Sequence, residues 1–124
     1  MPKKKHVASQ EPEKWTMEFL DERVEAEYDE FSIETKAKIK HIRELIGSVG
    51  LTGVGLPYVV HLQGDIWEIR SEAKDGWGRC LYCTKKGKKI ILLRCFIKKG
   101  NKTPPREIRL AIERMKAYIS IADS

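Results

Sequence analysis

The longest apolar run of the chain with β-forming character lies at residues 90–97, with the sequence IILLRCFI. This run is too short for a membrane span and favours a central strand, extended to 89–98 by the flanking lysines. Three shorter extended pieces precede it at 58–62, 66–71 and 79–84, and turn-like residues separate them. The four pieces together predict an antiparallel meander.

Helical spacing of apolar residues occurs twice before the meander. Ser32 is suited to cap the second helix, and Gly50 is suited to end it. A brief alternation at residues 15–19 predicts a short strand before both helices. We therefore expect a strand and then a helical hairpin, whose apolar positions are Leu20, Val24, Tyr28 and Phe31 in the first helix and Ile39, Ile42, Leu45, Ile46 and Val49 in the second.

The last element is predicted to be a helix over about 105–122. Thr103 is a good N-terminal cap and Pro105 suits the first turn. The apolar stripe that would pack on the sheet contains Ile108, Ile112, Met115, Ile119 and Ala122. The fold class predicted is α+β: a small twisted antiparallel sheet, an N-terminal helical hairpin and a C-terminal helix. Residues 15–124 form one domain on this interpretation, and residues 1–14 a flexible basic tail.

Charge is distributed unevenly along the chain. Residues 1–57 contain 9 Lys and Arg against 11 Asp and Glu, whereas residues 58–124 contain 15 against 7. The basic half also contains the predicted sheet, which favours nucleic acid or an acidic protein as partner over a merely soluble surface. The sequence shows neither a transmembrane helix nor a signal peptide, so we expect a cytoplasmic protein without a membrane partner.

Strand alternation sharpens this prediction. In the second extended piece Trp67 and Ile69 share one face and Arg70 the other, and in the last strand Ile91, Leu93, Cys95 and Ile97 oppose the basic residues. If the apolar sets face the helices, the other face of the sheet is open and basic. Arg79 lies on this open face if Cys80 and Tyr82 point inward. A structural ion pair between Glu68 and Arg70 is the alternative role for that arginine. The predicted open face contains Arg70, Arg79, Arg94, Phe96 and Lys98.

The chain contains three cysteines: Cys80, Cys83 and Cys95. The Cys80-x-x-Cys83 spacing is also found in metal and redox motifs, but residues three apart in a strand face opposite sides. A zinc site would need two further ligands, and the three histidines are scattered. We therefore expect buried free thiols, with no metal and no cofactor.

The sequence resembles a known family, the RelE/HigB-type toxins of bacterial and phage toxin–antitoxin modules. The resemblance rests on the segments WEIR at 67–70, GRCLY at 78–82, FIKK at 96–99 and KTP at 102–104, and it covers about residues 15–119. It implies a RelE-like fold and a metal-independent endoribonuclease that cleaves mRNA, commonly on the ribosome. It also implies a cognate antitoxin, either acidic or of helix-turn-helix type. Arg70, Arg79 and Lys98 or Lys99 match the family's basic positions.

The chemistry of such a site can be stated from the residues. Cleavage requires a base for the RNA 2′-hydroxyl, neutralisation of the phosphate charge, and a proton or cation at the leaving 5′-oxygen. Arginines suit the second task, and an adjacent aromatic ring can stack on a base. The catalytic residues predicted are Arg70, Arg79, Lys98 and Phe96, with RNA contacts from Arg94, Lys99, Lys102, Lys85 and Lys86.

The general base has three candidates, namely Lys98, Glu68 and His61. The chain departs from the family in this region, because Arg94 and Cys95 stand where members often have a histidine and a small residue, and Gly100 replaces a frequent threonine. Two other functions remain open. One is a toxin of the same fold that inhibits a protein such as gyrase, and the other is a nucleic-acid-binding module without catalysis.

Overall fold

Five strands form one sheet in the order β1-β5-β4-β3-β2. The computed structural model describes residues 15–54, 58–74, 76–85, 88–100 and 102–123. The antiparallel meander is confirmed, but β1 pairs in parallel with β5, so the sheet is mixed. The strands are β1 (Thr16–Phe19), β2 (Val59–Gln63), β3 (Ile66–Ala73), β4 (Gly76–Lys85) and β5 (Lys89–Lys98).

Three α-helices flank the sheet, as the sequence predicted: α2 (Glu22–Asp29), α3 (Ile33–Val49) and α4 (Pro105–Asp123). The Ser32 side chain accepts a hydrogen bond from the Thr35 amide at the start of α3. Gly50 follows α3 with φ of 80°, which is the left-handed conformation that glycine adopts without a steric penalty. A short 3₁₀ turn, η1 (Leu51–Gly53), leads away from it.

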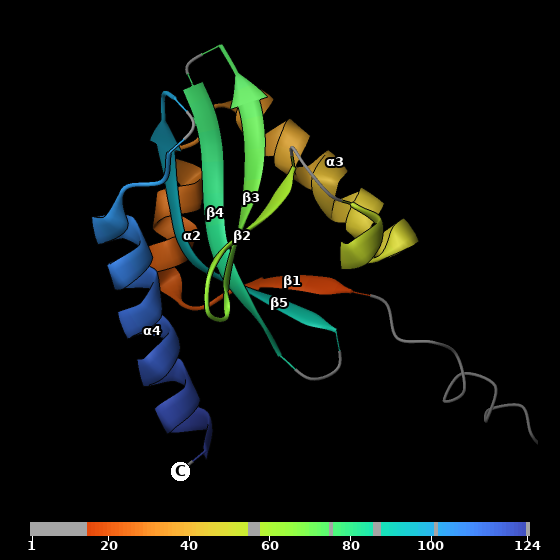
Figure 1. Cartoon of the computed structure of the whole chain (residues 1–124). Coiled ribbons are helices and arrows are strands. Elements are labelled where there is room, and N and C mark those ends of the chain that lie inside the picture. Colours follow the sequence, from red (N-terminus) through yellow and green to blue (C-terminus); the bar gives the residue numbers. More distant parts are fainter. Residues whose placement is uncertain (1–14, 55–57, 75, 86–87, 101, 124) are drawn as a thin grey trace, which may run out of the picture.

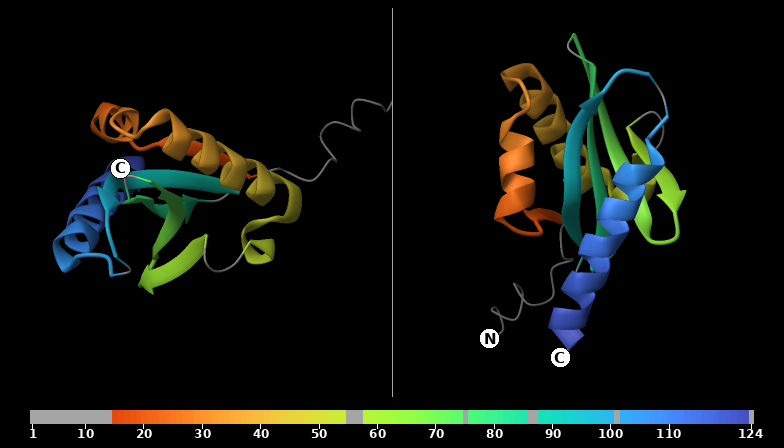
Figure 2. Two further views of the ribbon diagram at one scale, coloured as in Figure 1. Left: turned by 90° about the horizontal axis from the view of Figure 1, so that it is seen from above. Right: turned by 90° about the vertical axis from the view of Figure 1, so that its left-hand side faces the viewer.

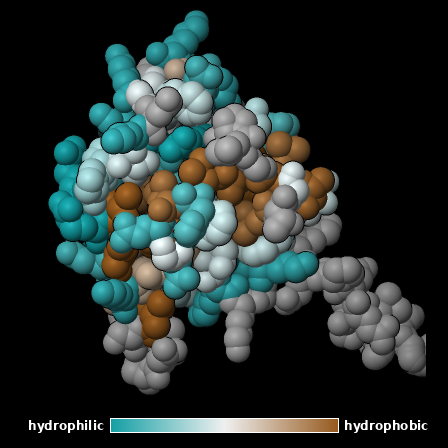
Figure 3. Space-filling view, viewed as in Figure 1, coloured by the Kyte–Doolittle hydropathy of each residue, from teal (hydrophilic) through white to brown (hydrophobic). Residues whose placement is uncertain are grey.

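The helices lie on both faces of the sheet (Figures 1 and 2). On one face α2 and α3 cover a core that contains Ile42, Ile69 and Tyr82. On the other face α4 packs over a second core, with Met115 against Leu81 and Leu93. Figure 3 shows hydrophobic surface on α4 at the left and beside α3 at the right, with hydrophilic side chains between them. The face expected to be open is therefore partly covered by α4.

Strict alternation fails in β5. The β4–β5 register shifts between Leu81 and Tyr82, which is the signature of a β-bulge. Because of it, Ile91 and Leu93 pack in the core beneath α4, whereas Cys95 packs beneath α2 and α3. The prediction that these three residues share a face is wrong, because the extra residue of the bulge reverses the alternation part-way along the strand.

The cysteines lie on opposite faces, as the spacing predicted. Cys80 and Cys95 are cross-strand partners in the core beneath α2 and α3, with their Sγ atoms 3.4 Å apart, and Cys83 lies in the core beneath α4. All three are buried free thiols. The hydrogen bond with Cys95 and burial raise the pKa of Cys80. Its thiol is thus a core side chain rather than a reactive nucleophile.

Some predictions concern residues outside the described ranges. These are the basic tail at 1–14 and the RNA contact assigned to Lys86. Within the described residues, no helix combines the length and apolar character needed to cross a bilayer.

Gly78 lets α3 approach β4 closely, and this contact can be tested. A Cβ atom at Gly78 would lie 2.4 Å from Thr35 Cγ2 and 3.8 Å from Ile39 Cδ1. We expect Gly78→Ala to lower the free energy of unfolding by about 1–3 kcal/mol, because both neighbours belong to the buried face of α3. The measurement is the midpoint of urea denaturation.

Gly47→Ala is the matched control for this substitution. Gly47 lies within α3, and a Cβ atom there would meet nothing within 4 Å. Alanine in a helix is favoured over glycine, so we expect stability to rise by about 0.5–1 kcal/mol. Equal effects of the two substitutions would mean that α3 does not pack on β4 in this way.

Candidate functional site

Three predicted site residues lie in one row across the sheet. Arg70 on β3 stands opposite Arg79 on β4, and Arg79 stands opposite Phe96 on β5. Lys98 follows two residues after Phe96 and is exposed at the end of β5. The predicted convergence of Arg70, Arg79 and Phe96 on one face is confirmed.

Arg79 does not lie on an open surface, contrary to the prediction. Its exposed fraction is 0%, because the chain between β5 and α4 crosses over it. One guanidinium nitrogen, Nη1, donates to Thr103 Oγ1 at 2.9 Å, and the other, Nη2, donates to the Gly100 carbonyl. Burial lowers the pKa of Arg79, and the nearby Glu68 carboxylate partly offsets this effect. The arginine therefore contributes to the structure of the site before any ligand is bound.

Glu68 joins these groups into one buried cluster. Its Oε1 accepts a hydrogen bond from Arg70 Nε at 2.5 Å, and its Oε2 accepts one from Thr103 Oγ1 at 2.6 Å. Arg79 Nη1 lies 3.7 Å from Oε2. We call Glu68, Arg70, Arg79 and Thr103 the Glu68 cluster. The ion pair between Glu68 and Arg70 that the sequence offered as an alternative is present, and the 18% exposed side chain of Arg70 connects the cluster to solvent.

Thr103 has a different task from the one expected. Its hydroxyl donates to Glu68 and accepts from Arg79, whereas the Pro104 carbonyl accepts the first helical hydrogen bonds, from the amides of Glu107 and Ile108. The prediction that Thr103 caps α4 is wrong, because the buried charges compete for the same hydroxyl. Pro105 does begin the helix, as predicted.

Arg94 belongs to a second charged network and not to a free basic patch. Its guanidinium lies 2.7 Å from Glu107 of α4 and 2.9 Å from Glu27 of α2. Glu27 also pairs with Arg114 of α4 at 2.9 Å. The hydrogen bond with Glu107 raises the pKa of Arg94 despite burial. The prediction that Arg94 belongs to a basic open face is thus wrong, because both helices supply carboxylates that pair with it.

The remaining predicted RNA contacts separate into two places. Lys99 and Lys102 are exposed beside the Glu68 cluster, in the connection that covers Arg79. Lys85 lies six residues beyond Arg79 along β4, on the order of 20 Å away. Its Nζ donates to the Tyr118 hydroxyl at 3.0 Å. Lys85 therefore does not lie at the same site.

His61 is also distant from the cluster. Its register partner is Trp67, which alternates with Glu68 and Arg70 along β3 and so faces the other side of the sheet. The imidazole stacks on Trp67 with 4.6 Å between ring centroids, and Nε2 lies 2.7 Å from the Gly64 carbonyl. Among the three bases considered, His61 is not placed to reach a phosphate beside Arg70.

Comparison with known proteins gives one family. The profile of the family described as "Phage derived protein Gp49-like (DUF891)" matches residues 26–116. The chain belongs to this Gp49-like family. The family is associated with toxin–antitoxin modules. No curated protein matches the chain.

The matched range of the Gp49-like family also contains three residues of the two networks that the predicted site did not include. Glu27 and Glu107 pair with Arg94 of β5, and Thr103 joins the Glu68 cluster. The signals for Thr103 were its place in the KTP segment of the family resemblance and its position beside Pro104, which also fits a helix cap. Glu27 lies 67 positions before Arg94, so nothing local in the sequence marks it as a partner.

The buried pair of the Glu68 cluster gives a stability prediction. Glu68→Gln preserves the shape of the side chain but leaves the buried Arg79 charge without its carboxylate. We expect the free energy of unfolding to fall by about 3 kcal/mol or more, measured by chemical denaturation. The control is Glu72→Gln, an exposed change four residues along the same strand, expected to stay within about 0.5 kcal/mol. A small, equal loss in both variants would contradict a charge-paired Arg79.

Glu27 predicts how stability depends on pH. Burial alone would raise the pKa of Glu27, but hydrogen bonds from Arg114 and the Cys95 amide, with the nearby Arg94, lower it below its ordinary value of 4.5. Between the pKa values of Glu27 in the folded and unfolded states, the unfolded chain binds more protons than the folded chain. The stability that Glu27 contributes is therefore fully present above pH 4.5, and it is lost as the pH falls through the lower pKa of the folded state.

We expect denaturation at a series of pH values to show this loss in the wild type. As a single titrating group, Glu27 contributes at most about 1.4 kcal/mol per pH unit to the slope of the unfolding free energy against pH. Glu27→Gln should have a shallower slope below pH 4.5 and lower stability at neutral pH. Identical acid slopes in the two proteins would exclude this role of Glu27.

Proposed function

We propose that this chain is the toxin of a type II toxin–antitoxin module and acts as a metal-independent endoribonuclease on mRNA, on the ribosome. The observation that carries the proposal is the cross-strand row in which Arg70 and the half-buried Phe96 ring flank Arg79, with exposed Lys98 two residues beyond Phe96 on β5. The resemblance to RelE/HigB toxins and membership of the Gp49-like family support the same conclusion. A cognate antitoxin is the partner that this function requires.

The role that we assign to each residue follows from the solvent exposure of its side chain. Arg70 reaches solvent and neutralises the charge that builds on the scissile phosphate. Phe96 offers a ring edge or face to a base. Arg79 is enclosed and acts as a positioning residue, since it holds Glu68 and Thr103, and Glu68 in turn fixes the Arg70 side chain.

The reaction is a transesterification. The RNA 2′-oxygen forms a bond to phosphorus while its proton passes to a base, and the bond from phosphorus to the 5′-oxygen breaks as that oxygen gains a proton from solvent water. Lys98 is our candidate for the base, acting as a neutral amine, because it is exposed at the end of β5, two residues after Phe96. Glu68 is less suited, because it is buried and already accepts hydrogen bonds from Arg70 and Thr103.

Cleavage of RNA tests the proposal directly. Purified protein is incubated with translating ribosomes, and separately with free RNA in the presence of a chelator. We expect fragments that end in a 2′,3′-cyclic phosphate, and a loss of cleavage rate of about 100-fold or more in Arg70→Ala and in Lys98→Ala. Arg109→Ala, an exposed change on α4, should cleave at the wild-type rate.

Thermal denaturation of each variant separates lost chemistry from lost folding. Wild-type cleavage by folded Arg70→Ala and Lys98→Ala would refute the assignment. Intact RNA with affinity that falls steeply as salt rises would instead identify a binding module. Intact message with arrested replication would identify a protein target.

A further inference from the structure

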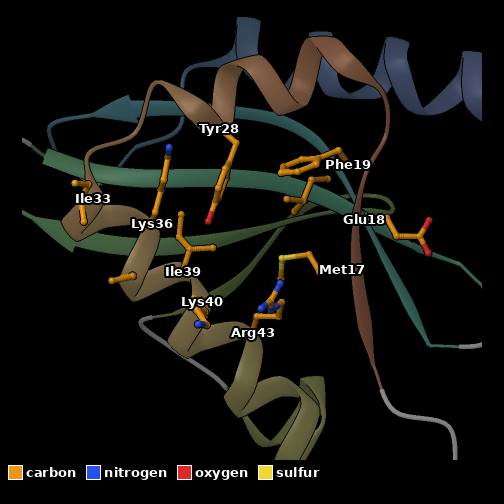
Figure 4. A pocket seen from close by; sticks show the side chains of 11 residues that line it. Met17, Glu18, Phe19, Tyr28, Ile33, Lys36, Ile39, Lys40 and Arg43 are labelled. Atoms are coloured by element: carbon orange, nitrogen blue, oxygen red, sulfur yellow. The ribbon is translucent and has the colours of Figure 1, made fainter.

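The face of the sheet opposite the Glu68 cluster contains a groove between β1, α2 and α3. The cavity has a volume of about 580 Å³. Figure 4 shows Met17 and Phe19 entering it from β1, Tyr28 from α2, and Ile39 from α3. The floor and walls are therefore apolar or aromatic.

Two of the lining side chains are large apolar groups that are exposed to solvent. Ile33, at the first turn of α3, is 88% exposed, and Phe19 is 36% exposed. Both line the same groove, one at each end of it (Figure 4). Apolar side chains exposed along one groove provide contacts for a partner that covers it.

The rim of the groove is basic. Lys36, Lys40 and Arg43 follow one another at i, i+4 and i+7 along α3, so they form one stripe beside the apolar surface. Lys36 lies 3.8 Å from Asp29. Among the residues that the structure describes, no carboxylate lies within 4 Å of Lys40 or Arg43. The one acidic lining residue, Glu18, lies 3.8 Å from Lys89.

The backbone of β1 adds unpaired polar groups beside the groove. Among the strands that the structure describes, β1 is an edge strand that pairs with β5 alone, and the amides of Thr16 and Leu20 donate to Lys88 and Leu92 on that side. In a parallel pair successive residues direct their backbone groups to opposite sides, so those of Met17 and Phe19 point to the free edge. A polypeptide can pair with such an edge, which favours a protein segment over a small molecule as occupant.

We infer that this groove binds an acidic amphipathic segment of a partner protein. Apolar side chains of the segment would pack against Phe19, Tyr28 and Ile33, and its carboxylates would face Lys40 and Arg43. The inference rests on the proposed function in one respect, namely that the partner is the antitoxin encoded beside the toxin. Because α2 and α3 lie on the other face from α4, the segment leaves Arg70 uncovered.

Charge reversal tests the surface. The full chain is titrated with the purified product of the adjacent gene, and the dissociation constant is measured by calorimetry at two salt concentrations. We expect Lys40→Glu/Arg43→Glu to weaken binding about tenfold or more and to remove most of its salt dependence. The matched control is Arg109→Glu/Lys116→Glu, the same charge change on exposed positions of α4, expected to alter affinity less than about twofold.

A second variant tests the apolar contact without risk to the fold. Ile33→Ser should weaken binding several-fold while leaving the thermal midpoint unchanged, because the side chain is 88% exposed in the free protein. Hydrogen exchange of the complex should show protection at residues 16–19 and 33–43.

Several outcomes would overturn the inference. These are equal affinities of the two charge-reversal variants, protection confined to α4 or to the Glu68 cluster, a second copy of this chain as the occupant, or no binding of the adjacent gene product. The RNA cleavage rate of the free chain is measured separately. Absent cleavage with groove-dependent binding would refute the proposed ribonuclease alone, whereas cleavage without groove-dependent binding would refute this inference alone.

Discussion

The arrangement of the site depends on one buried carboxylate, that of Glu68. It stands in a fully enclosed position beside the equally buried guanidinium of Arg79, with Arg70 and Thr103 as its hydrogen-bond donors. A buried charge is tolerated only where opposite charge and hydrogen bonds replace the water it has lost. The connection from β5 to α4 must therefore cross the sheet where Thr103 and the Gly100 carbonyl reach Arg79.

A second set of ionic contacts fixes the helices around β5. β1 pairs only with the first residues of β5, so backbone groups further along that edge need other partners. The Cys95 amide donates to Glu27 of α2, and the Leu93 carbonyl accepts from Arg114 of α4. Since Glu27 and Arg114 also pair with each other, helices from opposite faces of the sheet meet at this edge. The bulge of β5 occurs in the same stretch.

This architecture separates the two surfaces that the protein offers. Arg70, Lys98 and the lysines of the β5–α4 connection lie around the Glu68 cluster on the α4 side. The apolar groove with its basic rim lies on the α2–α3 side. The five-stranded sheet stands between them, so the surface proposed for RNA and the surface proposed for a protein partner do not compete for the same side chains.

Most elements could be predicted from the sequence, because they depend on local periodicity and on capping chemistry. The apolar spacing of α3 and the residues Ser32 and Gly50 determine where that helix begins and ends. The alternation in β3 likewise determined that Arg70 and Glu68 share a face, and their ion pair follows from being two residues apart.

Only the tertiary structure decided which of these groups meet solvent. Arg79 is indistinguishable from Arg70 in its local sequence pattern, yet it is fully buried in contact with Gly100 and Thr103, whereas Arg70 stays accessible. Arg94 is paired by two glutamates that are distant in sequence, Glu27 and Glu107. The reason is physical. Periodicity predicts which way a side chain points, whereas burial and charge pairing depend on segments that the whole fold brings together. The bulge in β5 also changes which way side chains point, and no residue pattern in that strand predicts it.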